Sequence, residues 1–131
     1  MAPMAPERFP ALRRAAERRG RRGEFMAALL LLAKGYRVLG RRVRTHAGEI
    51  DLIARSPLGI VCFVEVKVRR SLRDAQEALL PHQQARIARA AELYLARWRG
   101  LAVKGVRFDT IVISERHWPR HLRDAWRPGA G

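Results

Sequence analysis

Two charged residues interrupt the most hydrophobic segment of the chain. In Phe63-Val64-Glu65-Val66-Lys67-Val68, the residues Glu65 and Lys67 stand two positions apart. In a β-strand, alternate side chains point to the same face, so these two would lie one pleat apart. An acid and a lysine on one face, beside a second acid, are the groups that metal-dependent phosphodiester hydrolysis uses, because the acids bind the metal and the lysine orients or deprotonates the attacking water.

The second acid is Asp51, which follows Gly48-Glu49-Ile50 late in the preceding strand candidate. Two converging carboxylates repel each other and are usually held by a cation. Mg²⁺ suits them because it prefers oxygen ligands and keeps waters for a substrate phosphate, and Mn²⁺ is the expected substitute. Spacing alone does not place Asp51 beside Glu65, because the turn between the strands sets their offset. Glu65 and Lys67 could instead form a salt bridge that closes a strand end.

The elements that must position these residues alternate between helix and strand. Residues 24–34 are apolar on every face, which predicts a largely buried helix that ends before Gly35. Strands are predicted at 36–44, 49–54, 60–68 and 106–113, with helical stretches at 74–80 and 82–99. Residues 60–68 are nearly continuously apolar, which indicates a central strand covered on both faces. The order α-β-β-β-α-β predicts one α/β domain over residues 23–127 with a central mixed sheet flanked by helices. We expect a flexible basic arm or a helical extension at 1–22, an irregular segment from 114 onward, and a disordered tail at 128–131.

Composition narrows the class of partner. The 27 Lys and Arg residues outnumber the 12 Asp and Glu residues, which gives a net charge of +15. Such a charge attracts polyanions and predicts nucleic-acid binding, with anionic membranes and acidic proteins as the alternatives. Cys62 is the only cysteine, so an internal disulfide and a zinc site built on cysteine pairs are excluded. No apolar segment approaches the ~20 residues that span a bilayer, so we expect a cytoplasmic protein without a membrane contact.

The motifs together resemble a known family. The segments Gly48-Glu49-Ile50-Asp51-Leu52-Ile53-Ala54, Phe63-Val64-Glu65-Val66-Lys67 and Arg107-Phe108-Asp109 occur in the order typical of the YraN family of bacterial proteins, preceded by Gly23-Glu24 and Gly35-Tyr36. The resemblance runs from about residue 18 to residue 126. It implies a restriction-endonuclease-like fold, similar to that of Holliday-junction resolvases and other nucleases with an Asp…Glu-x-Lys motif.

That resemblance implies roles for individual residues. Asp51 and Glu65 match the metal-binding acids, Lys67 matches the catalytic lysine, and Glu24 matches an additional helix acid of resolvase-like members or is a first-turn acid favoured by the helix dipole. Gln83 and Gln84 either contact the site or cap the long helix; family members often carry a lysine at the position of Gln83. The arginines after Lys67 are placed to hold a DNA backbone. They are Arg69, Arg70 and Arg73.

The expected function is therefore a Mg²⁺-dependent endonuclease that hydrolyses phosphodiester bonds of DNA, including branched or structured DNA. The alternative is a nucleic-acid-binding module that keeps the fold and hydrolyses nothing. Analogy with resolvases, which cut two strands symmetrically, implies a homodimer. Asp109 lies in a predicted buried strand and is expected to pair with an arginine near Arg107 rather than to act in catalysis.

Overall fold

A computed structural model describes residues 10–69 and 81–129 of the chain. Its helices are α1 (Pro10–Ala33) and α3 (Pro81–Arg97). Its strands are β1 (Arg37–Thr45), β2 (Gly48–Arg55), β3 (Val61–Arg69), β4 (Val106–Ser114) and β5 (His117–Leu122). Four of the five strands lie within two residues of the predicted ranges. The predicted helix at 74–80 lies outside the described residues.

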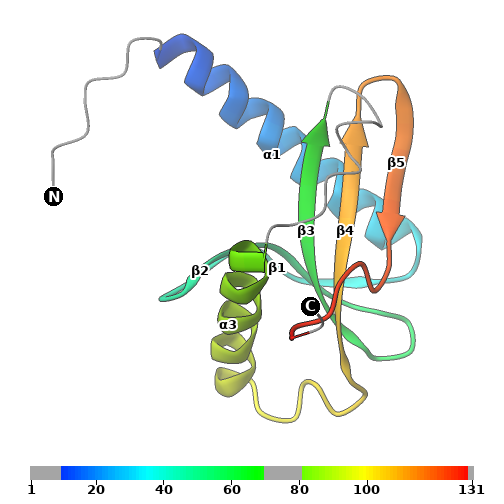
Figure 1. The fold of residues 1–131 in the computed structure, drawn as a ribbon. Coiled ribbons are helices and arrows are strands. Elements are labelled where there is room, and N and C mark those ends of the chain that lie inside the picture. The colour runs from blue at the N-terminus through cyan, green and yellow to red at the C-terminus, as the bar shows by residue number, and fades with distance from the viewer. Residues whose placement is uncertain (1–9, 70–80, 130–131) are drawn as a thin grey trace, which may run out of the picture.

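The strands form one mixed sheet in the order β1-β2-β3-β4-β5 (Figure 1). Neighbouring strands are antiparallel except β3 and β4, which run parallel. Parallel neighbours need a long crossover connection, and the segment that contains α3 supplies it. β3 therefore occupies the centre of the sheet, as its continuous apolar sequence predicted, and the predicted α/β fold class is confirmed.

Among the described elements, α1 covers one face of the sheet and α3 covers the other. Along β3, Cys62 and Val64 belong to the core under α1, whereas Val61 and Phe63 belong to the core under α3. This alternation places Glu65 on the α3 face. On that face the apolar residues Val61 and Phe63 precede Glu65 and the polar residue Lys67 follows it, so the apolar core ends at Glu65. The core under α1 is completed by Ala27, Ala28, Leu31, Tyr36, Leu52, Ala54, Ile111 and Ile113. The core under α3 is completed by Ile50, Ile53, Ala90, Ala91 and Phe108.

The prediction that the apolar helix is buried on every side is wrong. Ala27, Ala28 and Leu31 of α1 are buried, whereas Phe25 and Leu32 are 52% and 55% exposed. The small residues face the sheet because α1 approaches it closely. A methyl group built on Gly23 would lie 2.5 Å from Cγ2 of Val68. Close packing accounts for the small buried residues, whereas the direction in which a side chain points accounts for the others, because Leu31 is fully buried and Leu32 is exposed.

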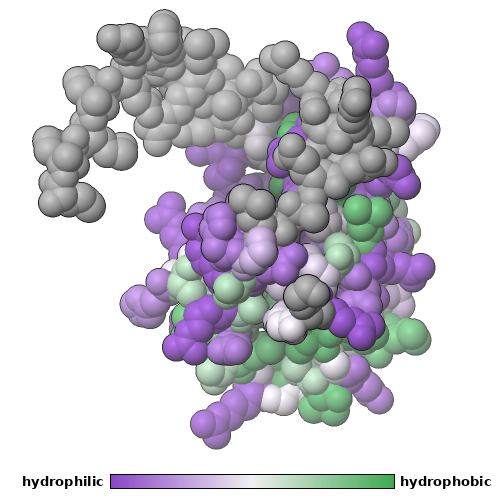
Figure 2. Space-filling model, viewed as in Figure 1, coloured by the Kyte–Doolittle hydropathy of each residue, from purple (hydrophilic) through white to green (hydrophobic). Residues whose placement is uncertain are grey.

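α1 begins at Pro10, so the helix continues through much of the segment in which an arm or a helical extension was predicted. The helical alternative holds for residues 10–22, and the boundary at residue 22 falls within one continuous helix. None of the helices in the described ranges is long and apolar enough to cross a membrane. Hydrophilic residues dominate the side of the surface over α3 and the β1–β2 hairpin (Figure 2).

The segment after residue 114 is not irregular as predicted, because it contains β5 at the edge of the sheet. A buried ionic network holds this strand. Asp109 of β4 accepts hydrogen bonds of 2.8 Å from both Nε and Nη2 of Arg107, and Nε2 of His121 lies 2.8 Å from Asp109 Oδ2. The backbone amide of Asp124 donates a further bond of 3.0 Å to Asp109. The predicted pairing of Asp109 with an arginine is confirmed, and that arginine is Arg107 itself.

Candidate active site

The two predicted acids meet where β2 and β3 separate. Backbone pairing between these strands runs from Arg55 opposite Val61 to Leu52 opposite Val64. One step further in the same register, Asp51 faces Glu65. At this position a side chain takes the place of backbone pairing between the two strands. Oδ2 of Asp51 accepts a hydrogen bond of 2.8 Å from the backbone amide of Val66. The register left open by the sequence thus places the two acids side by side.

A tight connection sets this register. The amide of Ser56 donates to the carbonyl of Ile60 (2.8 Å), and the amide of Ile60 donates to the hydroxyl of Ser56 (3.0 Å). Gly59 adopts φ +91°, a conformation that side chains with a Cβ rarely take. These bonds fix the length of the connection, and with it the offset that brings Asp51 opposite Glu65.

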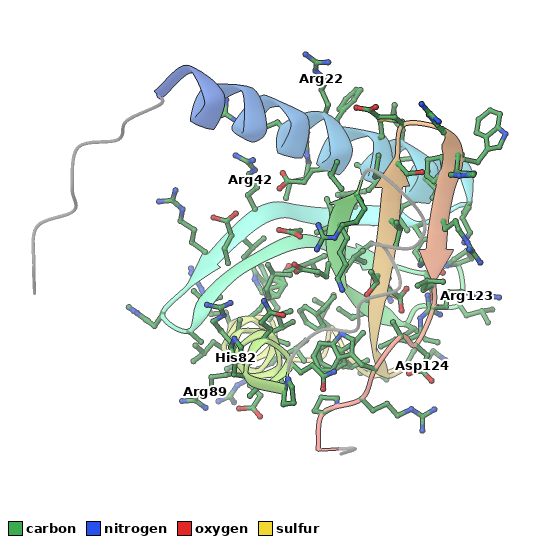
Figure 3. All side chains as sticks on the ribbon, turned by 45° about the horizontal axis from the view of Figure 1, so that its top comes forward. Arg22, Arg42, His82, Arg89, Arg123 and Asp124 are labelled. Carbon is green, nitrogen blue, oxygen red and sulfur yellow. The ribbon has the colours of Figure 1, made fainter. Side chains whose placement is uncertain are left out.

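Glu24 approaches the acids from α1 but is already paired. Its Oε2 accepts a hydrogen bond of 2.6 Å from Nε of Arg42, which lies between α1 and β1 in Figure 3. Arg42 has φ +49°, an uncommon conformation for a residue other than glycine, and lies opposite Asp51, between the residues of β1 that pair with Leu52 and Ile50. The charge of Glu24 raises the pKa of Asp51, so the two carboxylates are close enough to interact. Glu24 does not line the cavity described next.

An open cavity of about 260 Å³ lies over the two acids. β2, β3 and α3 form its walls, and most of its exposed lining is polar. The lining residues are Gly48, Glu49, Asp51, Glu65, Gln83, Arg86 and Ile87. Of the two glutamines predicted near the site, the structure brings Gln83 to the cavity and leaves Gln84 outside it. Arg86 was not predicted, because a single arginine on an arginine-rich helix carries no recognisable pattern.

Lys67 lies beside Glu65 rather than in the cavity wall. It is 7% exposed, and its positive charge acts against the rise in the pKa of Glu65. The predicted arrangement of Glu65 and Lys67 on one strand face is therefore present. Arg69 follows at the end of β3 and donates a hydrogen bond of 3.0 Å to the carbonyl of Val68. Arg70 and Arg73 lie outside the described residues.

Burial and mutual repulsion perturb both acids. Burial contributes most to the increase in the pKa of Glu65 to about 8, and the charge of Asp51 and a hydrogen bond with Asp51 add to it. Lys67 and Arg86 oppose that increase. Burial also raises the pKa of Asp51, although the hydrogen bond from the amide of Val66 favours its ionised form. At neutral pH the pair therefore holds a shared proton between the two carboxyl groups.

This donor set fits a hard divalent cation. Across the described ranges, no group of three or more His, Cys, Asp or Glu residues is arranged to hold a metal ion. Mg²⁺ does not need such a group, because it is commonly bound by one or two carboxylates and completes its shell with waters and substrate phosphate. Asp51 and Glu65 meet that requirement, and a cation between them would relieve the repulsion that now retains a proton.

Comparison with known proteins agrees with the order of these motifs. Residues 23–113, more than two thirds of the chain, match the Uncharacterised protein family UPF0102. The chain belongs to the UPF0102 family. A UPF0102 protein of Parvibaculum lavamentivorans is 49% identical over 134 residues, which cover 95% of this chain and 100% of the relative. A second, from Mesorhizobium japonicum, is 48% identical over 120 residues, with 92% of this chain and 95% of the relative covered. A third, from Bradyrhizobium sp. (strain BTAi1), is 50% identical and covers 92% of this chain and 84% of the relative.

The UPF0102 match confirms the resemblance to YraN proteins that the motifs indicated. The matched region begins at Gly23, the residue at which α1 comes closest to β3, and ends within β4. It therefore includes the two acids at the point where β2 and β3 separate and all the residues that line the cavity over them.

Proposed function

We propose that this UPF0102 protein is a metal-dependent endonuclease of the restriction-endonuclease-like group, which hydrolyses phosphodiester bonds of DNA. The observation that carries the proposal is the placement of Asp51 opposite Glu65 at the point where two strands separate, in an open polar cavity. A protein gains no stability from burying two adjacent carboxyl groups, because each raises the free energy of ionising the other. Such a pair is typical of a functional site.

Each residue has a distinct role in this proposal. Asp51 and Glu65 would hold Mg²⁺, which when bound polarises the phosphate and stabilises the charge that develops during hydrolysis. The amide of Val66 fixes the orientation of the Asp51 carboxylate through its 2.8 Å hydrogen bond. Lys67, two residues after Glu65 on the same strand face, would orient the attacking water or accept its proton.

The surface beside the cavity favours a polyanionic substrate. β1 is an edge strand next to the cavity and exposes Arg41, Arg42 and Arg44. The side chain of Arg44 is 89% exposed. Its ion pair with Glu49, at 3.6 Å, is too exposed to solvent to hold the side chain in one position. Exposed guanidinium groups bind phosphate oxygens in pairs and position a backbone without reading its sequence. DNA contacts along β1 would therefore bring a phosphodiester bond to the acids.

One observation favours the alternative, a nucleic-acid-binding module without hydrolysis. Glu24, the third acid near the site, is engaged by Arg42 at 2.6 Å and is not available to a metal in this arrangement. A binding module would use the same arginines, and its affinity for DNA would not depend on Mg²⁺. The two proposals therefore differ in whether cleavage exists and whether it requires the acids.

The test is cleavage of labelled four-way, flapped, single-stranded and plain duplex DNA by the purified protein. Each substrate is incubated with Mg²⁺, with Mn²⁺ and with EDTA. The structure suggests Asp51→Asn as the first variant, because the amide oxygen of asparagine can still accept the hydrogen bond from Val66 while the charge is lost. Lys67→Met is preferable to alanine, since Lys67 is almost fully buried and methionine fills most of its volume.

Glu92→Gln is the matched control, because Glu92 is an exposed acid on α3, paired with Arg89 and not lining the cavity. We expect metal-dependent cleavage by the wild type and Glu92→Gln proteins, and loss of cleavage with retained DNA binding in the Asp51→Asn and Lys67→Met proteins. DNA binding by the wild type without metal-dependent cleavage would instead establish the binding module.

A further inference from the structure

The cavity over the two acids has a cation in its wall. Among the described residues that line it, Arg86 of α3 is the one with a positive charge. Arg86 is exposed, so its guanidinium group is accessible from solvent. Its side chain lines the same cavity as the two acids, and its charge acts against the rise in the pKa of Glu65.

The β1–β2 hairpin shapes the position of this side chain. Gly48 has φ +143° and no side chain, and the aliphatic part of Arg86 packs directly on it. A methyl group built on Gly48 would lie 3.2 Å from both Cγ and Cδ of Arg86. The backbone of the hairpin at Gly48 therefore leaves room for the Arg86 side chain along the cavity wall. A larger residue at position 48 would displace that side chain.

The position of Arg86 would offset an electrostatic repulsion in the proposed nuclease site. The carboxylates that hold a metal also repel the negatively charged phosphate of the substrate. An arginine in the same cavity attracts that phosphate, and its planar group can bind two phosphate oxygens at once. We propose that Arg86 binds the phosphate group of the DNA that enters this cavity, and so positions the bond to be cleaved. The inference rests on the proposed nuclease function and adds a substrate-binding residue to it.

A merely structural role for Arg86 makes a different prediction for DNA binding. If Arg86 only neutralised the acids, its removal would leave DNA affinity unchanged. In either role, loss of a positive charge beside Asp51 and Glu65 favours a cation between them, so Arg86→Ala should bind Mn²⁺ at least as tightly as the wild type. Weaker DNA binding together with undiminished metal binding would therefore identify a contact with the substrate.

Arg89 provides the matched control. It lies one helical turn after Arg86, is exposed and paired with Glu92 at 3.1 Å, and does not line the cavity (Figure 3). Arg89→Ala removes the same net charge from the same helix. Arg86→Lys keeps the charge but loses the planar group, and distinguishes attraction in general from binding of two oxygens at once.

The experiment measures DNA affinity at several salt concentrations for Arg86→Ala, Arg86→Lys and Arg89→Ala, each also carrying Asp51→Asn so that DNA is not cleaved. We expect Arg86→Ala to weaken binding by about tenfold, as for loss of a hydrogen bond to a charged group. It should also reduce the dependence of log affinity on log salt by about 0.9, which corresponds to one phosphate contact. Arg89→Ala should change neither quantity by a comparable amount, and Arg86→Lys should retain the salt dependence with part of the affinity lost.

Gly48→Ala adds a second, independent variant. Its methyl group strains the backbone at φ +143° and also displaces Arg86, so the part of its effect on DNA binding that disappears in the Arg86→Ala protein is the part that acts through the arginine. Equal DNA binding by the Arg86→Ala and Arg89→Ala proteins, both in the Asp51→Asn background, would overturn the role of Arg86. Absence of metal-dependent cleavage by the wild type would overturn the nuclease itself, whatever the Arg86 variants do.

Discussion

Binding of a divalent metal to this protein should release a proton, because the acids that would hold the metal share one. Glu65 has a pKa of about 8, raised by burial and by Asp51, so at pH 7 about nine tenths of the molecules carry the proton. A metal ion between Asp51 and Glu65 requires the ionised form and would displace that proton. We therefore expect release of about 0.9 proton for each Mg²⁺ or Mn²⁺ bound at pH 7, falling to about 0.1 at pH 9. The metal affinity should increase with pH across this range.

Calorimetric titration with Mn²⁺ in buffers of different ionisation enthalpy measures the released proton directly. Glu65→Gln removes the titrating group and is expected to bind Mn²⁺ weakly and without a comparable release. The Glu92→Gln protein should behave as the wild type, because Glu92 is exposed and remote from the cavity. Tight metal binding at pH 7 with no proton released would refute the reasoning, since it would show that the two acids are already ionised or that the metal binds elsewhere.

Three further predictions concern the fold. Burial raises the pKa of the Cys62 thiol to about 12, so a thiol reagent at pH 8 should label Cys62 only after urea unfolds the protein. Burial alone would raise the pKa of Asp109, but hydrogen bonds from its partners, Arg107 among them, lower it to about 2. Asp109→Asn should therefore reduce the free energy of unfolding by about 3 kcal/mol at pH 7 in urea denaturation, with a smaller difference as the pH falls from about 4 to 2. Gly23→Ala places a methyl group 2.5 Å from Val68 and should destabilise the protein by about 1–3 kcal/mol, observed as a lower Tm.

The sequence predicted those parts of the site that depend on local periodicity. Glu65 and Lys67 share a strand face because side chains alternate along any β-strand, and the apolar residues around them identified the strand as central. The position of Asp51 opposite Glu65 could not be predicted in the same way. It depends on hydrogen bonds between Ser56 and Ile60 in the connecting turn, which no spacing rule specifies.

Elements whose position depends on tertiary contacts were missed. β5 contains Pro119, and four of its six positions are exposed, so its sequence lacks the alternating apolar residues of a half-buried strand. It is held at the sheet edge by the bond between His121 and Asp109, which are twelve residues apart. Burial of α1 was misjudged for a related reason. Hydrophobicity predicted that Phe25 would be buried, whereas the packing of α1 turns Ala27 and Leu31 toward the sheet and leaves Phe25 exposed.

The measurement that tests the central claim most directly is single-turnover cleavage of a labelled four-way DNA junction by wild type and Asp51→Asn proteins, with Mg²⁺ and with EDTA. The proposed nuclease predicts cleavage only by the wild type protein with the metal present, while both proteins bind the junction with similar affinity. Equal binding by both proteins with no cleavage in Mg²⁺ or Mn²⁺, or cleavage that persists in Asp51→Asn, would contradict it.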